Sequence, residues 1–433
     1  VLNGGSSNDL LTNTGGTSIT LFGGSGNDTL STSGGTQVEL TGEAGDNTYV
    51  LGGSGDSTQP ASVTLDDVDT FGATQSQTDG QSPGINTIEF AGEQGVRLDL
   101  SQASTGDASS DPPVQMVAGD LNVSLIGPFQ NVYGTPGNDY LHGNASANLL
   151  VAGGGNDTLV SGSGPATLVA GSGNDSLVSG SGGTTFRFSG NQFGSDVIDP
   201  PAPTSNTLDF SQYGGPVSLN LASTATQTVT PNAVGATNST GLTLTLASAT
   251  AVNGLIDSNY ADAIIGNALN DRFIVGPGGD TFTGGGGADS YFFTGANLGN
   301  VTINEGGAYN GVTAGSNNTL NFLGFTSSGV KVDLSKSAGT QTVANGLTLA
   351  MPNFEAFSTV IGTPYSDTLL AGGGNSTLIG AGGDDSLVAG PGNDMVQGNV
   401  TQVVYLDFSQ ELPGEYIYQP ADQQAILARL QHD

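Results

Sequence analysis

The feature that most constrains the fold is a short repeat with two different periods. Residues 153–177 read GGGNDTLVSGSGPATLVAGSGNDSL, in which glycines and hydrophobic residues return every nine residues. The acid returns only every eighteen, at Asp157 and Asp175, and Ala166 holds the position halfway between them. A short fixed period is typical of solenoids, in which each repeat becomes stable only by stacking on its neighbours. A coil of two nine-residue segments would place Asp175 directly over Asp157, with a neutral turn on the opposite side.

The repeat occurs in four blocks that differ in where they carry acid. In the first block Asp9 and Asp28 lie nineteen residues apart, so its coil is slightly longer. In the third block an acid stands at every ninth position, so we expect cations on both sides of it. The expected segments are 1–55 (block 1), 56–133 (connector 1), 134–190 (block 2), 191–253 (connector 2), 254–293 (block 3), 294–360 (connector 3), 361–399 (block 4) and 400–433 (C-terminal strand and helix).

Each repeat combines a tight turn with a very short strand. The glycines before the acid let the backbone adopt positive φ, and the residue two after the acid should point inward, because side chains alternate along a strand. Two strands and two turns per coil predict an all-β, parallel β-solenoid with a thin hydrophobic interior. The expected inward residues are Leu11, Leu30, Leu141, Leu159, Leu177, Leu369 and Leu387.

The composition leaves little room for a conventional core. Of 433 residues 71 are Gly and only 35% are hydrophobic, so folding costs much backbone entropy with few large side chains to offset it. The 39 Asp and Glu against 6 Lys and Arg give a formal net charge of −33. Such a chain lacks the basic patches that nucleic acid requires and any apolar run long enough to span a membrane, so its expected partners are cations.

The repeats resemble those of a known family. Sequences such as GGSGNDTLS (23–31) follow the pattern G-G-x-G-x-D-x-U-x, which is similar to the RTX, or haemolysin-type, calcium-binding repeat. The resemblance implies a right-handed parallel β-roll, with calcium held between successive turns by aspartate carboxylates and glycine-loop carbonyls. It also implies a secreted, extracellular or cell-surface protein, exported by a bacterial type I-like route, that folds after export.

The turn aspartates are the candidate metal ligands. Carboxylates and carbonyls are hard oxygen ligands that suit Ca²⁺, whereas zinc favours His or Cys, of which there are 2 and 0. The alternative, that Asn-Asp turns merely favour a left-handed backbone, explains a single turn but not acids held at fixed spacing through several coils. The candidate calcium ligands are Asp9, Asp28, Asp139, Asp157, Asp175, Asp262, Asp271, Asp280, Asp289, Asp367, Asp385 and Asp394.

The connectors share a second, longer repeat. The sequence NTIEF at 86–90 recurs as NTLDF at 206–210 and NTLNF at 318–322, each followed by alternating strand patterns. We expect the connectors to continue the sheet as metal-free coils with looped-out insertions. The acids Asp66, Asp67 and Asp69 are interpreted as a solvated cluster in one such loop, and His142 as a solvent-facing strand residue rather than a ligand. The expected loops are 56–85, 102–117, 199–205 and 223–240.

The C-terminal stretch changes character. Pro420, followed by the hydrophobic residues Ala425 to Leu430, predicts a helix. This stretch could cap the solenoid, could open a further connector because LDFSQ at 406–410 repeats that at 208–212, or could enter a catalytic domain, since it weakly resembles the start of matrixin-like secreted metalloproteases.

We expect a non-enzymatic structural protein: a calcium-stabilised solenoid of a surface layer, adhesin stalk or head-to-tail filament. The alternative is a non-catalytic secretion and folding module of a secreted hydrolase such as a metalloprotease. No H-E-x-x-H and no G-K-[ST] motif occurs, and no regular T-x-T ladder of the kind needed to bind ice or carbohydrate. Because the sequence opens inside the repeat pattern, we expect a fragment of a longer polypeptide, and end-to-end contact with other copies is a possible partner interaction.

Overall fold

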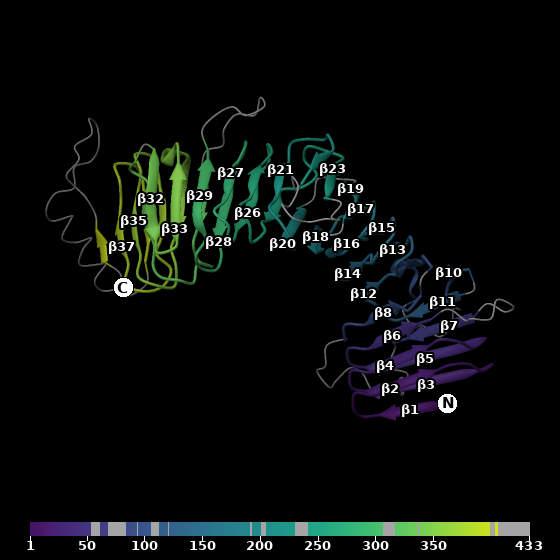
Figure 1. Cartoon of the computed structure of the whole chain (residues 1–433). Coiled ribbons are helices and arrows are strands. Elements are labelled where there is room, and N and C mark those ends of the chain that lie inside the picture. The colour runs from purple at the N-terminus through teal and green to yellow at the C-terminus, as the bar shows by residue number, and fades with distance from the viewer. Residues whose placement is uncertain are drawn as a thin grey trace. The chain divides into compact units, whose positions relative to one another are not determined.

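The structure is a computed structural model built almost entirely of short strands (Figure 1). It divides into two compact units, which are described separately. Unit 1 comprises Val1–Leu208, Thr224–Thr228 and Val234–Ala251, and unit 2 comprises Asp209–Ser223, Val229–Ala233 and Val252–Asp433. The structure describes residues 1–52, 61–67, 84–92, 94–104, 112–119, 121–190, 193–200, 205–229, 241–305, 317–336, 338–398 and 403–405.

In unit 1 one long run of parallel strands forms one side of the coils. Two other sheets, used one after the other along the chain, supply the opposite side. The long run is β2 (Leu10–Asn13), β4 (Thr29–Thr32), β6 (Thr48–Leu51), β8 (Thr87–Phe90), β12 (Asn131–Tyr133), β14 (Asn148–Val151), β16 (Ala166–Ala170) and β18 (Thr184–Gly190). The first opposing sheet is β1 (Leu2–Gly5), β3 (Ile19–Ser25), β5 (Gln37–Ala44), β7 (Ala61–Asp66), β11 (Leu121–Ile126) and β10 (Val114–Ala118). The second is β9 (Arg97–Asp99), β13 (Tyr140–His142), β15 (Thr158–Val160), β17 (Ser176–Val178), β19 (Ser195–Asp199), β23 (Thr243–Leu246) and β22 (Gln227–Thr228).

Unit 2 repeats this plan. Strand β20 (Thr207–Tyr213) contains the division between the units. Two 3-10 turns, η1 (Leu100–Gln102) and η2 (Phe354–Ala356), lie in the connectors. The long run of unit 2 is β24 (Gly254–Ile256), β26 (Arg272–Val275), β28 (Ser290–Phe293), β30 (Asn318–Asn321), β34 (Phe357–Ile361), β36 (Thr377–Ile379) and β38 (Met395–Gln397). The opposing strands are β21 (Ser218–Asn220), β25 (Ala263–Ile265), β27 (Thr281–Thr283), β29 (Gly299–Asn304), β33 (Leu347–Met351) and β32 (Gly339–Ala344), then β31 (Lys331–Asp333), β35 (Thr368–Leu370), β37 (Ser386–Val388) and β39 (Val403–Tyr405).

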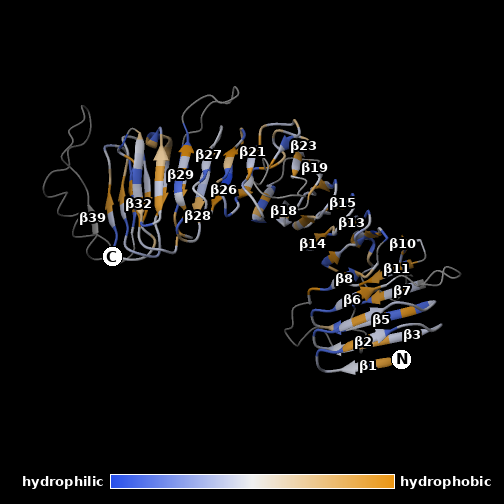
Figure 2. Ribbon diagram, viewed as in Figure 1, coloured by the Kyte–Doolittle hydropathy of each residue, from blue (hydrophilic) through white to orange (hydrophobic). Residues whose placement is uncertain are grey.

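The strand register confirms the predicted parallel solenoid. In the parallel ladder of block 2, Leu141 pairs with Leu159 and Leu159 with Leu177, so residues eighteen apart lie in successive coils. The predicted inward leucines are fully buried, except Leu11, which is only partly covered because β2 pairs on one side alone. Hydrophobic and hydrophilic residues alternate along strands such as β5 (Figure 2). The interior is therefore a ladder of single side chains rather than a broad core.

The connectors continue the coils, as expected, but each adds an antiparallel strand that the sequence did not predict. The antiparallel pairs are β10 with β11, β22 with β23, and β32 with β33. The last pair turns through Asn345 and Gly346, and Gly346 has a φ of 80°, a backbone conformation that suits a tight hairpin. The predicted loops 56–85, 102–117 and 223–240 were wrong in part, because they contain β7, most of β10 and β22, respectively. The predicted C-terminal helix lies outside the described residues.

Large aromatic side chains fill the coils of block 3. The rings of Phe273, Phe282 and Tyr291 lie 5.2–5.9 Å apart, and Phe293 stacks on Phe322 at 4.5 Å. Aromatic rings bury far more apolar surface than leucine. The interior of this block therefore contributes more hydrophobic stabilisation than the leucine ladder of block 2.

Truncating one leucine of that ladder tests its contribution. Leu159→Ala should lower the free energy of unfolding by about 2–5 kcal/mol, because Leu141 and Leu177 cannot collapse into the cavity while their strands stay in register. Denaturant unfolding in saturating calcium measures this. Leu11→Ala, at the equivalent but partly exposed position, should cost clearly less; equal costs would contradict a buried ladder.

Candidate metal centre

The predicted aspartates stack in columns at the turns that precede the strands. In block 2 the column is Asp139, Asp157 and Asp175, and it continues to Asp196, which the sequence reading missed. Each Oδ1 accepts a hydrogen bond from the backbone N–H of the column residue one coil earlier, at 2.6–2.9 Å. Asp139 begins the column, accepting from the N–H of Val96 at 2.7 Å. One side-chain oxygen per coil therefore ties each turn to the next.

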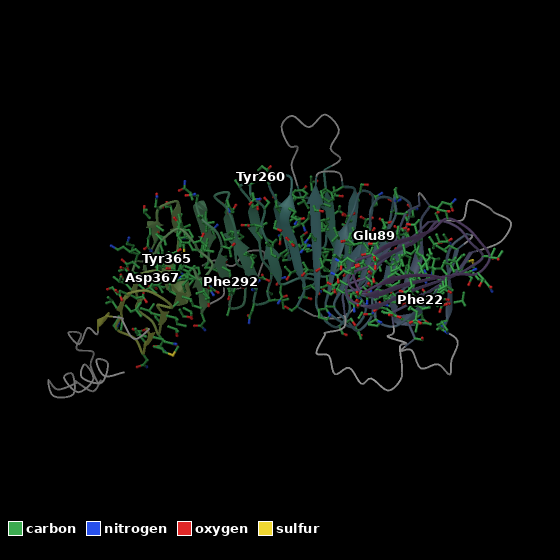
Figure 3. The ribbon with its side chains drawn as sticks, turned by 90° about the horizontal axis from the view of Figure 1, so that it is seen from below. Phe22, Glu89, Tyr260, Phe292, Tyr365 and Asp367 are labelled. Carbon is green, nitrogen blue, oxygen red and sulfur yellow. The ribbon has the colours of Figure 1, made fainter. Side chains whose placement is uncertain are left out.

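The other predicted aspartates form shorter columns of the same kind. Block 3 carries one on each side, so its acids alternate between the two sides as the nine-residue spacing predicted. In block 4 the Oδ1 of Asp385 accepts from the N–H of Asp367, which is labelled with Tyr365 of the same turn in Figure 3. The stacked pairs are Asp9 with Asp28, Asp262 with Asp280, Asp271 with Asp289, Asp367 with Asp385, and Ser376 with Asp394.

Asparagine fills the same position where a column ends, which shows that the ladder bond does not need a charge. The Oδ1 of Asn47 accepts from the N–H of Asp28 at 3.0 Å, and that of Asn318 accepts from the N–H of Asp289 at 2.7 Å. A neutral carboxamide makes the bond without placing a charge in a buried turn. The aspartates must therefore serve a purpose that an amide cannot.

Many of the column carboxylates have one oxygen that is buried and receives no hydrogen bond within the described part of the chain. Burial disfavours the charged form, and it raises the pKa of Asp157, Asp196 and Asp289 to about 7 and that of Asp271 to about 8. Buried negative charge of this kind calls for a cation. The oxygens are Oδ2 of Asp9, Asp28, Asp157, Asp196, Asp280 and Asp289, Oδ1 of Asp271 and Oε2 of Glu305.

The first aspartate of three columns is different because hydrogen bonds from its own turn satisfy it. Asp139 accepts from the N–H of Thr135 at 2.6 Å through Oδ2 and from its hydroxyl at 2.9 Å through Oδ1. Ser258 serves Asp262 in the same way, and Thr363 serves Asp367. These three acids act as polar caps where a column begins.

In several turns a glycine five residues before the acid makes room for the carboxylate, whereas alanine or valine holds that position before Asp157, Asp175 and Asp280. A Cβ on Gly23 would stand 2.3 Å from Oδ2 of Asp28, and one on Gly266 would stand 2.4 Å from Oδ2 of Asp271. Real Cβ atoms do not approach so closely, so a larger residue would displace the carboxylate. The glycine of the repeat thus fixes where the acid points, as well as how the turn bends.

Two connector acids occupy that glycine position one coil beyond the end of a block, and the sequence reading placed neither there. Asp67 follows β7 at the level of Gly42, and Glu305 follows β29 at the level of Gly284. Each accepts from a buried tyrosine, with Tyr49 Oη to Asp67 at 2.8 Å and Tyr291 Oη to Glu305 at 2.5 Å. The expectation of a solvated acidic loop was therefore wrong for Asp67, and also for Asp66, which lies in β7 and is buried; Asp69 lies outside the described residues.

The two sites differ in how the acid is satisfied. The carboxamide groups of Asn47 and Asn86 both donate to Asp67, and burial raises its pKa to about 7. At the second site the corresponding residue is an acid, Asp289, and Oε2 of Glu305 receives no donor from the described residues. Burial raises the pKa of Glu305 to about 8. Neutral amides complete the site of Asp67, whereas the site of Glu305 places two acids together.

The sequence did not predict Asp196 as a column residue because of its distance from Asp175. It lies twenty-one residues after Asp175 rather than eighteen, since extra residues follow β18. The run DVID at 196–199, an acid followed by a strand, was the available signal.

His142 was expected to face solvent. Its Nδ1 lies 3.1 Å from Oδ1 of Asp99, and its side chain is about one-quarter exposed.

The donor set fits calcium. Carboxylates of successive coils stack in turns that also contain glycine carbonyls, and Ca²⁺ accepts six to eight oxygen ligands in flexible geometry. The family model described as the RTX calcium-binding nonapeptide repeat (4 copies) matches residues 20–36, 133–168, 166–185, 258–297 and 361–396. The chain carries RTX calcium-binding repeats. No curated protein matches the chain.

The RTX repeats bind several calcium ions, and proteins that carry them are typically secreted. The repeats themselves are typically non-catalytic. Within the described ranges there is no helix both long and apolar enough to cross a membrane. All four sequence blocks contain part of a family match. In block 1 the match is confined to 20–36, where the nineteen-residue coil departs from the nonapeptide spacing.

The raised pKa values predict different pH responses of stability with and without calcium. In the metal-free chain, buried acids keep their protons at pH values where the unfolded chain has lost them, so stability should rise as pH falls from 8 to 5. In saturating calcium the carboxylates of both the folded and the unfolded chain are ionised over this range, so stability should change little, and the stability that calcium adds should shrink as pH falls because the ion must displace the protons. Thermal unfolding at several pH values, with and without calcium, measures both trends; parallel trends would contradict buried metal-binding carboxylates.

Proposed function

We propose that this chain is a non-enzymatic extracellular structural protein whose stacked coils are held together by calcium, as in a surface layer, an adhesin stalk or a filament. The observation that carries the proposal is the set of buried carboxylate oxygens without donors, repeated coil after coil. In this proposal the twelve aspartates named from the sequence, together with Asp196, line the calcium sites. The capped acids Asp139, Asp262 and Asp367 contribute where a column begins.

Calcium would contribute most of the net stability. If each site binds with a Kd of roughly 0.1 mM and free calcium is roughly 1 mM, each adds about 1.4 kcal/mol. About a dozen independent sites then supply on the order of 17 kcal/mol, which matches or exceeds the net stability of a typical domain. At the much lower calcium concentration of a cytosol this contribution nearly vanishes. The chain would therefore fold where calcium is abundant, outside the cell.

A structural role is supported by the way connectors join blocks within each unit. In unit 1, β8 of connector 1 pairs in parallel register with β6 of block 1 and with β12, so no break separates block from connector. In unit 2, β30 of connector 3 pairs in the same way with β28 of block 3 and with β34. Each coil adds about 4.8 Å along a stack. A continuous stack within each unit is suited to spanning distance.

Calcium titration tests the proposal directly. The chain in chelator should show little β-sheet signal by circular dichroism and should gain it cooperatively as calcium reaches the millimolar range, because ion binding offsets carboxylate repulsion. Equimolar magnesium is the control, since it dehydrates reluctantly and demands stricter geometry. Negative-stain microscopy of the calcium form distinguishes filaments from single particles. A spectrum and melting temperature unchanged by chelator would overturn the proposal.

A single substitution tests whether the columns hold the ions. Asp289→Asn gives block 3 the carboxamide that Asn47 provides in block 1, keeping the acceptor for the N–H of Asp271 and adding a donor for Glu305. The variant should bind at least one calcium fewer per chain and should be more stable than wild type in chelator. Bound calcium measured by elemental analysis, with thermal unfolding, checks both.

Asp289→Ala is the matched control because it also removes the acceptor for the N–H of Asp271. It should be less stable than Asp289→Asn both with and without calcium. If Asp289→Asn bound as much calcium as wild type, Asp289 would not be a ligand.

A further inference from the structure

Asp257 stands at a position where most of the other predicted aspartate turns carry glycine and the rest alanine or valine. It directly follows β24 and lies five residues before Asp262. Gly134 and Gly362 hold the same position before Asp139 and Asp367. A carboxylate therefore stands in block 3 where the turns that begin the columns of blocks 2 and 4 have only a hydrogen atom, and the repeat pattern assigns it no role.

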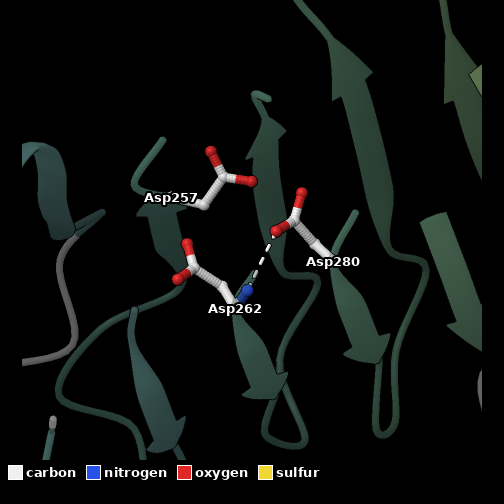
Figure 4. Close-up of side chains that lie close together, drawn as sticks. All are labelled: Asp257, Asp262 and Asp280. Carbon is white, nitrogen blue, oxygen red and sulfur yellow. Dashed lines mark hydrogen bonds between the residues drawn. The ribbon is translucent and has the colours of Figure 1, made fainter. Parts of the chain in front are cut away.

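Three buried carboxylates meet at this point. One oxygen each of Asp257, Asp262 and Asp280 lies within 4.8 Å of the other two, and the residues are 4%, 3% and 0% exposed. Figure 4 shows Asp257 and Asp262 beside one another and Asp280 in the next coil, linked by the bond from the N–H of Asp262 to Oδ1 of Asp280 at 2.9 Å. Two successive coils thus contribute to one cluster.

Some oxygens of these three carboxylates accept hydrogen bonds, but no basic side chain among the described residues pairs with them. Both oxygens of Asp257 accept from the N–H of Gly276, at 2.9 and 3.0 Å, and Asp262 is satisfied by Ser258 and Val217. Oδ2 of Asp280 is buried and receives no donor from the described residues. Nor does any Lys, Arg or His side chain that the structure describes form an ion pair with the three acids.

We propose that Asp257, Asp262 and Asp280 form a three-carboxylate calcium site that binds more tightly than a site between two column aspartates alone. The inference rests on the proposed function and adds a ligand from outside the repeat. Oxygens bound to Ca²⁺ at 2.3–2.6 Å lie up to about 5 Å apart across the ion, so a cluster within 4.8 Å can surround one. More ligand charge raises affinity for calcium.

The state of the acids without calcium is consistent with this assignment. Burial, and then the charge of Asp280, raises the pKa of Asp257, and burial raises that of Asp280 to about 7. A cation between the carboxylates would remove the repulsion and displace the protons. Without a cation the cluster therefore lowers the stability of the fold, and with calcium bound it raises that stability.

Equilibrium calcium binding to the whole chain tests the proposal. Wild type should show one class of sites tighter than the rest. Asp257→Asn should weaken that class about tenfold, because one ionic ligand is lost while the acceptor for Gly276 is kept. Asp384→Asn removes the same charge from an exposed turn of block 4 and should bind like wild type. If Asp257→Asn and Asp384→Asn gave the same curve, Asp257 would not be a ligand.

A second variant separates binding from folding. Asp257→Gly restores the residue found at Gly134 and Gly362, so it should fold in calcium and should show the same weakened class as Asp257→Asn. A wild-type affinity in this variant would overturn the proposal. The two hypotheses fail differently: wild type that binds no calcium refutes the proposed function, whereas calcium-binding wild type with unaffected Asp257 variants refutes only the assignment of Asp257.

Discussion

The structure depends on one hydrogen bond that recurs at the turns, from a backbone N–H to a side-chain oxygen one coil further along the chain. The bond holds successive turns in register, and it is made equally well by Asp157 and by Asn318. Where the acceptor is aspartate, the second oxygen is buried and lacks a donor in several coils. A buried carboxylate without a partner is costly, so the same device that aligns the coils creates the demand for cations.

The distribution of acid and amide divides the molecule into parts with different requirements. In the second block the acids line one side, and Ala166 lies at the corresponding turn on the other, where no charge is buried. Connector turns use amides such as Asn86 and Asn206 instead. Under the proposed function calcium is needed in the blocks and at Asp196, whereas connector coils aligned by amides stack by hydrogen bonds and hydrophobic side chains.

The ends of the blocks show how small changes alter this requirement. Tyr49 and Tyr291 stand where a leucine normally points inward, and each reaches an acid from the next connector. At Asp67 two carboxamides complete the arrangement without a metal, whereas Glu305 faces a second acid, Asp289. The first part of block 3 adds Asp257 to its own column in a related way. The glycine position is thus where extra charge enters the fold.

Spacing alone determined the coil, the parallel register and most of the aspartate columns, because residues separated by one full coil must stack whatever surrounds them. It could not find Asp196, Asp257 or Glu305, since insertions change their distance from the repeat and none occupies the aspartate position of an eighteen-residue period. Nor could it find the antiparallel strands of the connectors. These features follow from pairing between segments separated by loops of irregular length, and only the tertiary structure decides which side chains such pairing brings together.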